Sequence, residues 1–318
     1  MRPGHLPVHA RAALPEGLVV VARDEVKPQG PVFDPRPVRR RPIRVLRGGP
    51  EGIVAAYAVS GGRVRVSLLA PSPLPESETG PALEVARALL GLDDDTTAFV
   101  SAMRGDARLG ELVRTLDTRI GRVPTVFEGF AVAVVEQLVT GFEARASIRR
   151  LWRIAGEPVG TTSLRAAPTP AAVRRVPMWR LHEIGVGSRR AATLRAGALR
   201  GAALERLREV APEDALVRLQ SLPGVGPWTA NHVAKNALGW ADAVPVGDAH
   251  AHYLVTEALT GVQGDDEAML RALEPYRPNR ARVVTLVESA VFGGRGLSSI
   301  RKPRLPRVDP HRREPWRY

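Results

Sequence analysis

The chain has 318 residues, enough for two packed units, and its composition of 44% hydrophobic and 25% charged residues is that of a folded protein. A net charge of +13, from 46 Lys and Arg against 33 Asp and Glu, favours a polyanionic partner such as nucleic acid, although an arginine-rich genome would also raise the arginine count. The absence of cysteine excludes disulfides, thiolate zinc sites and cysteine-ligated iron–sulfur clusters.

The N-terminal part of the sequence predicts a small α+β unit. Residues 1 to about 50 are rich in Pro, Arg and Gly, which is typical of loops around a short strand at residues 18–21. Two runs with β-branched residues, 53–59 and 64–69, flank Gly61-Gly62 and predict a hairpin. No apolar signal region and no stretch of eighteen apolar residues is present, so we expect a cytoplasmic protein without a membrane partner.

From Gly80 onward, apolar residues recur with the period of an α-helix, and nearly every segment between residues 127 and 294 predicts a helix. Asp93, Asp94 and Asp95 precede one of these helices. We expect them to cap it rather than to bind a cation, because acidic side chains at a helix start complement its dipole.

A turn between two apolar helices reads Leu222-Pro-Gly-Val-Gly-Pro-Trp228. Gly224 and Gly226 allow backbone angles that other residues avoid, and the turn opens a helix. Main-chain amides of both glycines and of the first helical turn, which contains Thr229, would point outward as unpaired donors suited to a DNA phosphate. A tight helix corner that binds nothing would contain the same glycines.

The run from Leu222 to Asn231, followed by Asp248, resembles the helix-hairpin-helix element and the essential aspartate of the DNA glycosylase superfamily (HhH-GPD). It is most similar to the bacterial 3-methyladenine DNA glycosylase II branch (AlkA-like), and the likeness covers roughly residues 115–292. The resemblance implies an accessory α+β domain at 1–115, an all-α helix-hairpin-helix domain at 116–294 with its active site in a cleft, and a basic, flexible tail at 295–318.

The resemblance also implies a reaction. The enzyme would flip a damaged base, above all an alkylated purine, out of double-stranded DNA and hydrolyse its N-glycosidic bond. Asp248 is the expected catalytic residue, because a carboxylate beside C1′ stabilises an oxocarbenium-like sugar and can orient or deprotonate water. It would also cap the helix that begins near Ala249. Trp228 stands where strand-cutting members carry a Schiff-base lysine, so a monofunctional enzyme without lyase activity is expected.

Further roles follow from the same resemblance. Trp228 and His232 are expected in the base pocket, although Trp228 is equally well explained as a core tryptophan. Leu138 would fill the gap left by the flipped base, with Gln137 beside it against the opposite strand, and His250 would lie near a phosphate.

No cofactor is expected apart from a K⁺ or Na⁺ ion held by hairpin carbonyls. Its ligands would be Gln220, Leu222 and Val225. A zinc site at Asp248, His250 and His252 would need a further ligand that nothing identifies. We expect a monomer that acts on DNA at the nucleoid, in base excision repair. The alternatives are a glycosylase for uracil, mispaired adenine or a bulky alkyl adduct, and a non-catalytic protein that binds DNA structures.

The last predicted helix departs from the resemblance. Residues 283–288 contain no tryptophan or tyrosine where some members carry an aromatic residue, so the base pocket is expected to differ from the alkylpurine pocket. Arg277, Arg280 and Arg282 open this helix and are interpreted as a solvated basic face rather than as phosphate contacts.

Overall fold

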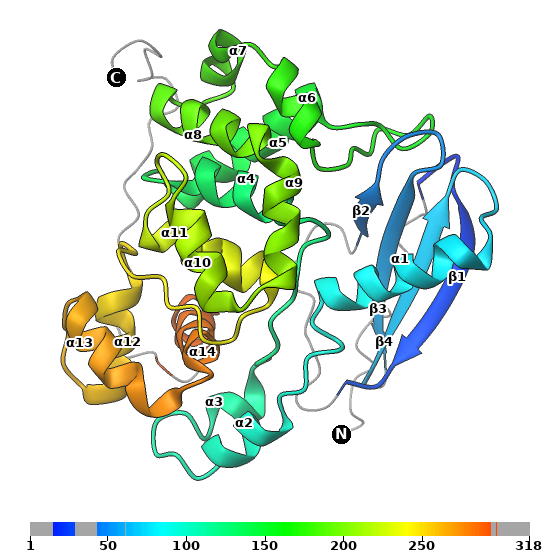
Figure 1. Cartoon of the computed structure of the whole chain (residues 1–318). Helices are drawn as coiled ribbons and strands as arrows, with labels where there is room; N and C mark the ends of the chain where they lie inside the picture. The colour runs from blue at the N-terminus through cyan, green and yellow to red at the C-terminus, as the bar shows by residue number, and fades with distance from the viewer. Residues whose placement is uncertain (1–14, 29–42, 61, 294–296, 298–318) are drawn as a thin grey trace, which may run out of the picture.

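The computed structural model describes residues 15–28, 43–60, 62–293 and 297. Figure 1 shows a small sheet beside a larger helical body. Of the predicted basic tail at 295–318, all but residue 297 lies outside the described residues, as do residues 1–14 and 29–42 of the predicted loop-rich segment from 1 to about 50. Within the ranges just given, no helix combines the length and the hydropathy needed to cross a membrane.

Four strands form the sheet in the order β1-β4-β3-β2, and every neighbouring pair is antiparallel. The strands are Val19–Val26 (β1), Ile43–Arg47 (β2), Ile53–Ser60 (β3) and Arg63–Ala70 (β4). The predicted hairpin is the β3–β4 pair. The strand predicted at residues 18–21 corresponds to β1. Strand β2 was not predicted, because its five residues follow a Pro- and Arg-rich stretch that is typical of a loop.

Most of the remaining chain is helical, as the apolar periodicity predicted. The helices are Glu76–Leu89 (α1), Thr97–Met103 (α2), Leu112–Thr115 (α3), Val126–Glu136 (α4), Gly141–Ala155 (α5), Pro170–Arg175 (α6), Met178–Glu183 (α7), Ser188–Leu199 (α8), Gly201–Glu205 (α9), Pro212–Gln220 (α10), Pro227–Val233 (α11), Ala251–Thr260 (α12), Asp266–Leu273 (α13) and Arg280–Gly293 (α14). Two 3₁₀ turns, Arg206–Glu209 and Glu274–Tyr276, and a π-helical turn, Ala234–Leu238, connect some of them.

Side chains along a strand alternate between the two faces of a sheet, and other parts of the chain cover both faces here. Val66 and its neighbours on one face pack against α1. Val54 and Leu69 on the other face pack against Val159, which comes from the loop between α5 and α6. Figure 1 shows this green loop reaching the sheet, so a loop of the helical body contributes to the core of the sheet.

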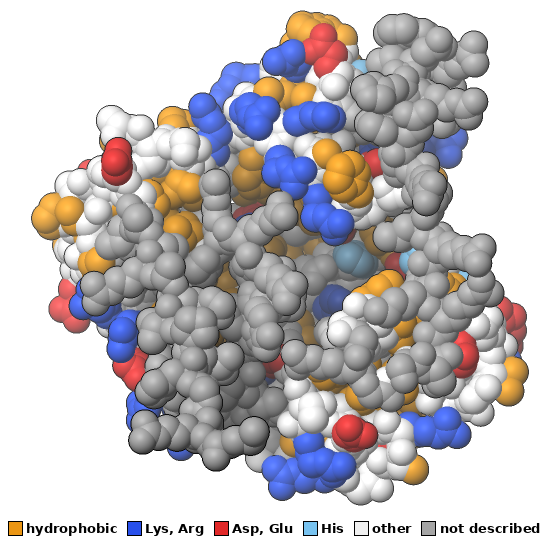
Figure 2. All heavy atoms as spheres, turned by 180° about the vertical axis from the view of Figure 1, so that it is seen from behind, with side chains coloured by type: hydrophobic (Ala, Val, Ile, Leu, Met, Phe, Trp, Pro, Cys, Tyr) orange, Lys and Arg blue, Asp and Glu red, His pale blue; other side chains and the backbone are white. Residues whose placement is uncertain are grey.

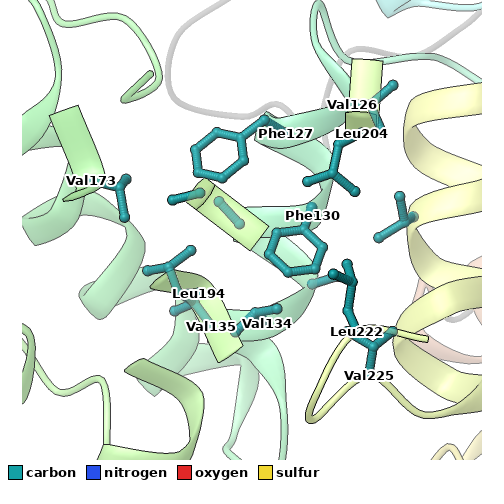
Figure 3. Packing of buried hydrophobic residues seen from close by; sticks show 14 of the residues in the cluster. Val126, Phe127, Phe130, Val134, Val135, Val173, Leu194, Leu204, Leu222 and Val225 are labelled. Carbon is teal, nitrogen blue, oxygen red and sulfur yellow. The ribbon is translucent and has the colours of Figure 1, made fainter. Parts of the chain in front are cut away.

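The larger core cluster is built around α4, which is buried on nearly all sides. The rings of Phe127 and Phe130 stack with their centroids 6.2 Å apart. Gly197 lets α8 cross α4 closely, because a Cβ there would lie 2.1 Å from the Phe130 ring. Leu222 and Val225 of the hairpin point into the same cluster (Figure 3), so the hairpin is anchored on the helical core.

A second cluster joins α12, α13 and α14 to the short helices α2 and α3. Phe99 and Leu112 lie in it together with Leu254 and Met269. Although α2 and α3 precede the domain boundary predicted at residue 115, they therefore pack with the helical body rather than with the sheet.

Two of the arginines that open α14 are buried, so the solvated basic face predicted for them is wrong. Arg280 and Arg282 are 8% and 6% exposed. Arg280 makes hydrogen bonds of 2.9 and 2.6 Å to the carboxylate of Asp242, and Arg282 makes bonds of 2.5 and 2.7 Å to that of Asp94. Only Arg277 is exposed, and it pairs with Asp242 as well. Each of these arginines therefore joins two segments that are far apart in the sequence.

Candidate active site

The hairpin between α10 and α11 depends on one of its two glycines. Gly224 has a φ of +80°, and a Cβ there would lie 2.0 Å from Thr193 Oγ1, so only glycine fits. Gly226 has an ordinary φ of −94°, and a Cβ there would meet no atom within 4 Å. The sequence predicted unusual backbone angles at both glycines, and the structure has them only at Gly224. Gly226 leaves open space beside the first turn of α11.

Gln137, which ends α4, ties that helix to the hairpin. Its Nε2 donates to Gly224 O at 3.0 Å and to Thr229 Oγ1 at 2.8 Å. Thr229 is buried, so a contact of this residue with DNA would use its main chain. The sequence assigned all three residues to DNA, and the structure brings them together in one hydrogen-bonded group that fixes the hairpin against α4.

Leu138 follows Gln137 and is both strained and exposed. It has a φ of +53°, the one positive value at a non-glycine position in the described chain, and its side chain is 98% exposed. A non-glycine residue in this region costs about 1–3 kcal/mol. The conformation is fixed by Gln137 before it and by the capping box of α5 after it, in which Thr140 and Glu143 bind each other. Strained non-glycine residues are frequent at functional sites.

Asp248 lies just before α12 and is held by three hydrogen bonds. Its Oδ1 accepts from the amides of His250 at 2.8 Å and Ala251 at 3.0 Å, and its Oδ2 accepts from Trp228 Nε1 at 2.8 Å. The predicted cap is not what the structure shows, because α12 begins at Ala251 with His250 at its N-cap position and no side chain caps it. Asp248 instead accepts from the two amides at the entry to the helix. The three donors hold the carboxylate in a single orientation.

These bonds also set the charge of Asp248. Burial would raise its pKa, but the hydrogen bonds from the His250 amide, the Trp228 indole and the Ala251 amide outweigh burial and lower the pKa below its ordinary value. Asp248 is therefore an ionised carboxylate at neutral pH, which can stabilise a developing positive charge.

The indole N–H at the edge of Trp228 donates a hydrogen bond to Asp248, and the face of the indole stacks on His232. The ring centroids of Trp228 and His232 are 4.4 Å apart with an interplanar angle of 28°. Burial lowers the pKa of His232 to about 4, with the Lys235 charge lowering it further and Asp248 opposing the shift. His232 is thus neutral at pH 7. Trp228 is only partly buried, so the core tryptophan that the sequence allowed is not what the structure shows.

Replacing Trp228 by phenylalanine keeps a flat ring and removes one donor to Asp248. Since that bond lowers the Asp248 pKa, we expect the acid limb of base release to move to higher pH and the plateau rate to fall about tenfold or more. The measurement is a single-turnover pH profile. Trp179→Phe, at an exposed tryptophan of α7, is the matched control, and an unshifted acid limb would contradict a positioning role for the indole.

Three further ionisable side chains, which no sequence motif marks, lie near the group formed by Asp248, Trp228 and His232. Glu136 of α4 has Oε2 3.8 Å from His232 Nδ1. Lys235, in the π-helical turn, donates to Thr285 Oγ1 at 3.4 Å. Burial raises the pKa of Glu288 in α14, with Lys235 opposing that shift and Asp248 adding to it. These residues come from three separate segments, so no local pattern marks them.

The histidines after Asp248 bind within the protein. His250 Nδ1 shares a hydrogen bond of 3.1 Å with Tyr253 Oη, and His252 Nδ1 lies 3.0 Å from Asp248 O. In the part of the chain that the structure describes, no group of three or more His, Asp or Glu side chains is arranged to hold a metal ion. The zinc alternative therefore gains no support from the geometry.

The three hairpin carbonyls predicted to hold a monovalent cation differ in their hydrogen bonding. Leu222 O accepts a hydrogen bond of 3.1 Å from Val225 N. Within the described ranges, no main-chain hydrogen bond reaches the carbonyls of Gln220 or Val225. Free carbonyl oxygens are the ligands that such ions prefer.

Arginines are concentrated in α5 to α8 and their connections, where residues 141–200 contain twelve Arg and three Glu. Exposed examples are Arg145, Arg149, Arg153 and Arg189. Figure 2 shows Lys and Arg side chains gathered on the upper half of one face, above a hollow in which histidine and basic side chains are visible. A basic surface next to such a hollow suits a phosphate backbone. The predicted cleft itself stays a prediction.

No protein-family model and no curated protein sequence matches the chain. Solved structures do. The 3-methyladenine DNA glycosylase from Archaeoglobus fulgidus has a TM-score of 0.70 at 21% identity, over 85% of this chain and 97% of that chain. The apo form of the Clostridium acetobutylicum 8-oxoguanine glycosylase/lyase has a TM-score of 0.60 at 16% identity, over 77% and 87%.

A DNA-3-methyladenine glycosidase from Bacillus halodurans has a TM-score of 0.51 at 20% identity, over 63% of this chain and 92% of that chain. The similarity to the archaeal enzyme spans most of the described chain, whereas the Bacillus enzyme matches a smaller share. The protein therefore has the fold of the helix-hairpin-helix DNA glycosylases.

Proposed function

We propose that this protein is a DNA N-glycosylase that extrudes a damaged base from double-stranded DNA and hydrolyses its bond to deoxyribose. The observation that carries the proposal is Asp248, an ionised carboxylate fixed by three hydrogen bonds next to Trp228. The fold shared with solved DNA glycosylases supports the same class of reaction. A protein that only bound DNA structures would not need this carboxylate.

In the proposed reaction the electrons of the C1′–N bond leave with the base, and C1′ becomes positively charged. The Asp248 carboxylate stabilises that charge. A carboxylate has about four lone-pair sites, and three are used by protein donors, so one is left to orient water. The water oxygen then bonds to C1′ and its proton is released. The products are the free base and an intact strand with an abasic site.

We propose hydrolysis without strand cleavage, because Trp228 occupies the position where the resemblance would put a Schiff-base lysine and its indole nitrogen is not nucleophilic. Borohydride added during base release should then trap no covalent enzyme–DNA adduct. Lys235 is the lysine nearest the site and is the matched control. A trapped adduct that disappears in Lys235→Met would identify that amine as a nucleophile and contradict the proposal.

We propose that Leu138 fills the gap left by the flipped base, as its strain and its exposure support. Leu138→Ala should slow base release from duplex DNA by about tenfold or more, since a flipped base costs a few kcal/mol of lost stacking and pairing. Release from a single-stranded oligonucleotide, which needs no wedge, should change less. Val262→Ala shortens an exposed apolar side chain in the turn between α12 and α13 and should leave both rates unchanged. An equal loss on both DNA forms would contradict the wedge role.

The first candidate substrates are alkylated purines, to which the resemblance points and which the names of two structural neighbours support. Uracil, mispaired adenine and bulky alkyl adducts are the second class. The proposed enzyme acts as a monomer in base excision repair, with its basic α5–α8 surface along the DNA backbone. It needs no cofactor beyond a K⁺ or Na⁺ ion at the hairpin.

The test is a panel of duplexes that each contain one damaged base, scored for abasic sites with wild type and Asp248→Asn side by side. Release of at least one base by wild type and its loss in the variant would support the proposal. Tight binding of the panel without release of any base would overturn it. Repeating the binding in tetramethylammonium salt tests the cation, because affinity should fall when neither K⁺ nor Na⁺ is present.

A further inference from the structure

Helix α14 passes through the second core cluster and presents two polar side chains on one side. Residues 281–284, 286 and 287 are buried, whereas Thr285 and Glu288 are partly exposed. Positions three apart lie on the same helix face. The hydrogen bond from Lys235 Nζ to Thr285 Oγ1 shows that this face is turned toward the π-helical turn.

Lys235 extends the row of side chains that begins at Asp248. Trp228 binds Asp248, His232 stacks on Trp228 four residues later, and Lys235 follows after three more. The helix changes from α to π geometry at Ala234, and such π turns are frequent at functional sites. A base whose sugar lies at Asp248 would thus place its ring along Trp228 and His232 and its far edge toward Lys235.

Glu288 and Lys235 lack strong partners within the protein. In the described residues, the Glu288 carboxylate accepts no hydrogen bond, and Lys235 forms no ion pair within 4 Å. The opposite charges nevertheless influence each other, since Lys235 opposes the rise that burial causes in the Glu288 pKa. Partly buried charges without partners are costly, so their presence beside Asp248 suits a ligand that pairs with both.

We propose that Lys235 and Glu288 read the far edge of the flipped base and select guanine-derived bases. An ammonium group only donates hydrogen bonds, and a carboxylate only accepts them through two oxygens. Guanine offers the complementary edge, in which O6 accepts from Lys235 while N1–H and N2–H donate to the two oxygens of Glu288. This inference rests on the proposed function and names its substrate.

The other bases complement this pair less well. Adenine offers one amino donor on that edge and no second one beside it, so one carboxylate oxygen stays unpaired. Uracil places a carbonyl where guanine has its N2 amino group, and that carbonyl would face a carboxylate oxygen. Methylation at N7 or N3 leaves the guanine edge intact, and an N7-methylated guanine departs as a neutral base. The inferred substrates are therefore guanines damaged away from this edge.

The experiment compares single-turnover release from duplexes with 7-methylguanine and with 3-methyladenine, for wild type, Glu288→Gln and Lys235→Met. Wild type should release 7-methylguanine faster by about tenfold or more, the discrimination that one good bidentate contact provides. In either variant, the ratio of the 7-methylguanine release rate to the 3-methyladenine release rate should fall toward one. Glu267→Gln, an exposed carboxylate of α13, is the matched control and should keep the ratio.

Three outcomes separate the inference from the proposed function. If wild type releases neither base nor any other in the lesion panel, the proposed function fails. If wild type releases both bases equally, or if both variants keep the wild-type ratio, the inference alone is overturned. Should neither variant fold, competition is measured with wild type only, and free 7-methylguanine must inhibit at lower concentration than free 3-methyladenine for the inference to stand.

Discussion

Asp248→Asn is expected to lower the single-turnover rate of base release by at least about 100- to 1,000-fold, because it removes the negative charge that stabilises the developing sugar cation. Asparagine has nearly the same size, and its carbonyl oxygen can still accept from the His250 and Ala251 amides. These two hydrogen bonds at the entry to α12 therefore remain. The amide nitrogen cannot accept from Trp228, so a small loss of stability is expected as well.

The measurement is abasic-site formation under enzyme excess, together with the DNA dissociation constant and the melting temperature. Glu257→Gln makes the same change of charge on the exposed side of α12 and is the matched control. DNA binding should persist in both variants, because the proposed backbone contacts come from the hairpin and the arginines. Wild-type turnover in Asp248→Asn would remove the basis of the proposed function.

Asp242→Ala is expected to lower the free energy of unfolding by about 3–5 kcal/mol, the cost of breaking a buried ion pair by removing one partner. Arg280 would keep only the exposed Glu274 carboxylate, 3.7 Å away. Arg280 is 8% exposed and makes bonds of 2.9 and 2.6 Å to Asp242, whose carboxylate also accepts from the Arg280 amide. The substitution removes every one of these acceptors at once.

Urea unfolding provides the measurement, and an exposed ion pair on α13 provides the control. Glu267→Gln removes an exposed carboxylate that binds Arg271 at 2.7 Å, and exposed pairs contribute only about 0–1 kcal/mol. A loss in Asp242→Ala no larger than that in Glu267→Gln would show that the Arg280 pair does not stabilise the fold as its burial indicates.

Residues that belong to one short segment could be predicted from the sequence. The hairpin and the downstream aspartate are such segments. Asp95 was predicted to cap α2, but Thr96 holds the N-cap position, and the Asp95 Oδ1 accepts from Thr97 N at 2.9 Å. Neighbouring Asp94 was assigned the same role. Its carboxylate instead binds Arg282, 188 residues away, a contact that no local pattern contains.

The side chains of the site that the sequence did not mark were also missed because their contacts join distant segments. Glu136, Lys235 and Glu288 lie on three elements, and each has the appearance of an ordinary surface residue on its own helix. The π-helical turn that carries Lys235 has no sequence signal either, because its residues have the composition of an α-helix. Only packing brings these three side chains to the group around Asp248 and His232, so a local motif can indicate the chemistry but not the residues inferred to select the base.

The loop between α5 and α6 has a consequence for how the protein unfolds. Val159 fills one face of the sheet, and Arg44 of β2 forms an ion pair with Glu128 of α4, which is buried in the helical body. Neither part can lose its structure without exposing apolar surface of the other. Heating should therefore melt the sheet and the helices in a single cooperative transition, and a fragment that lacks the strands should not keep a stable helical body.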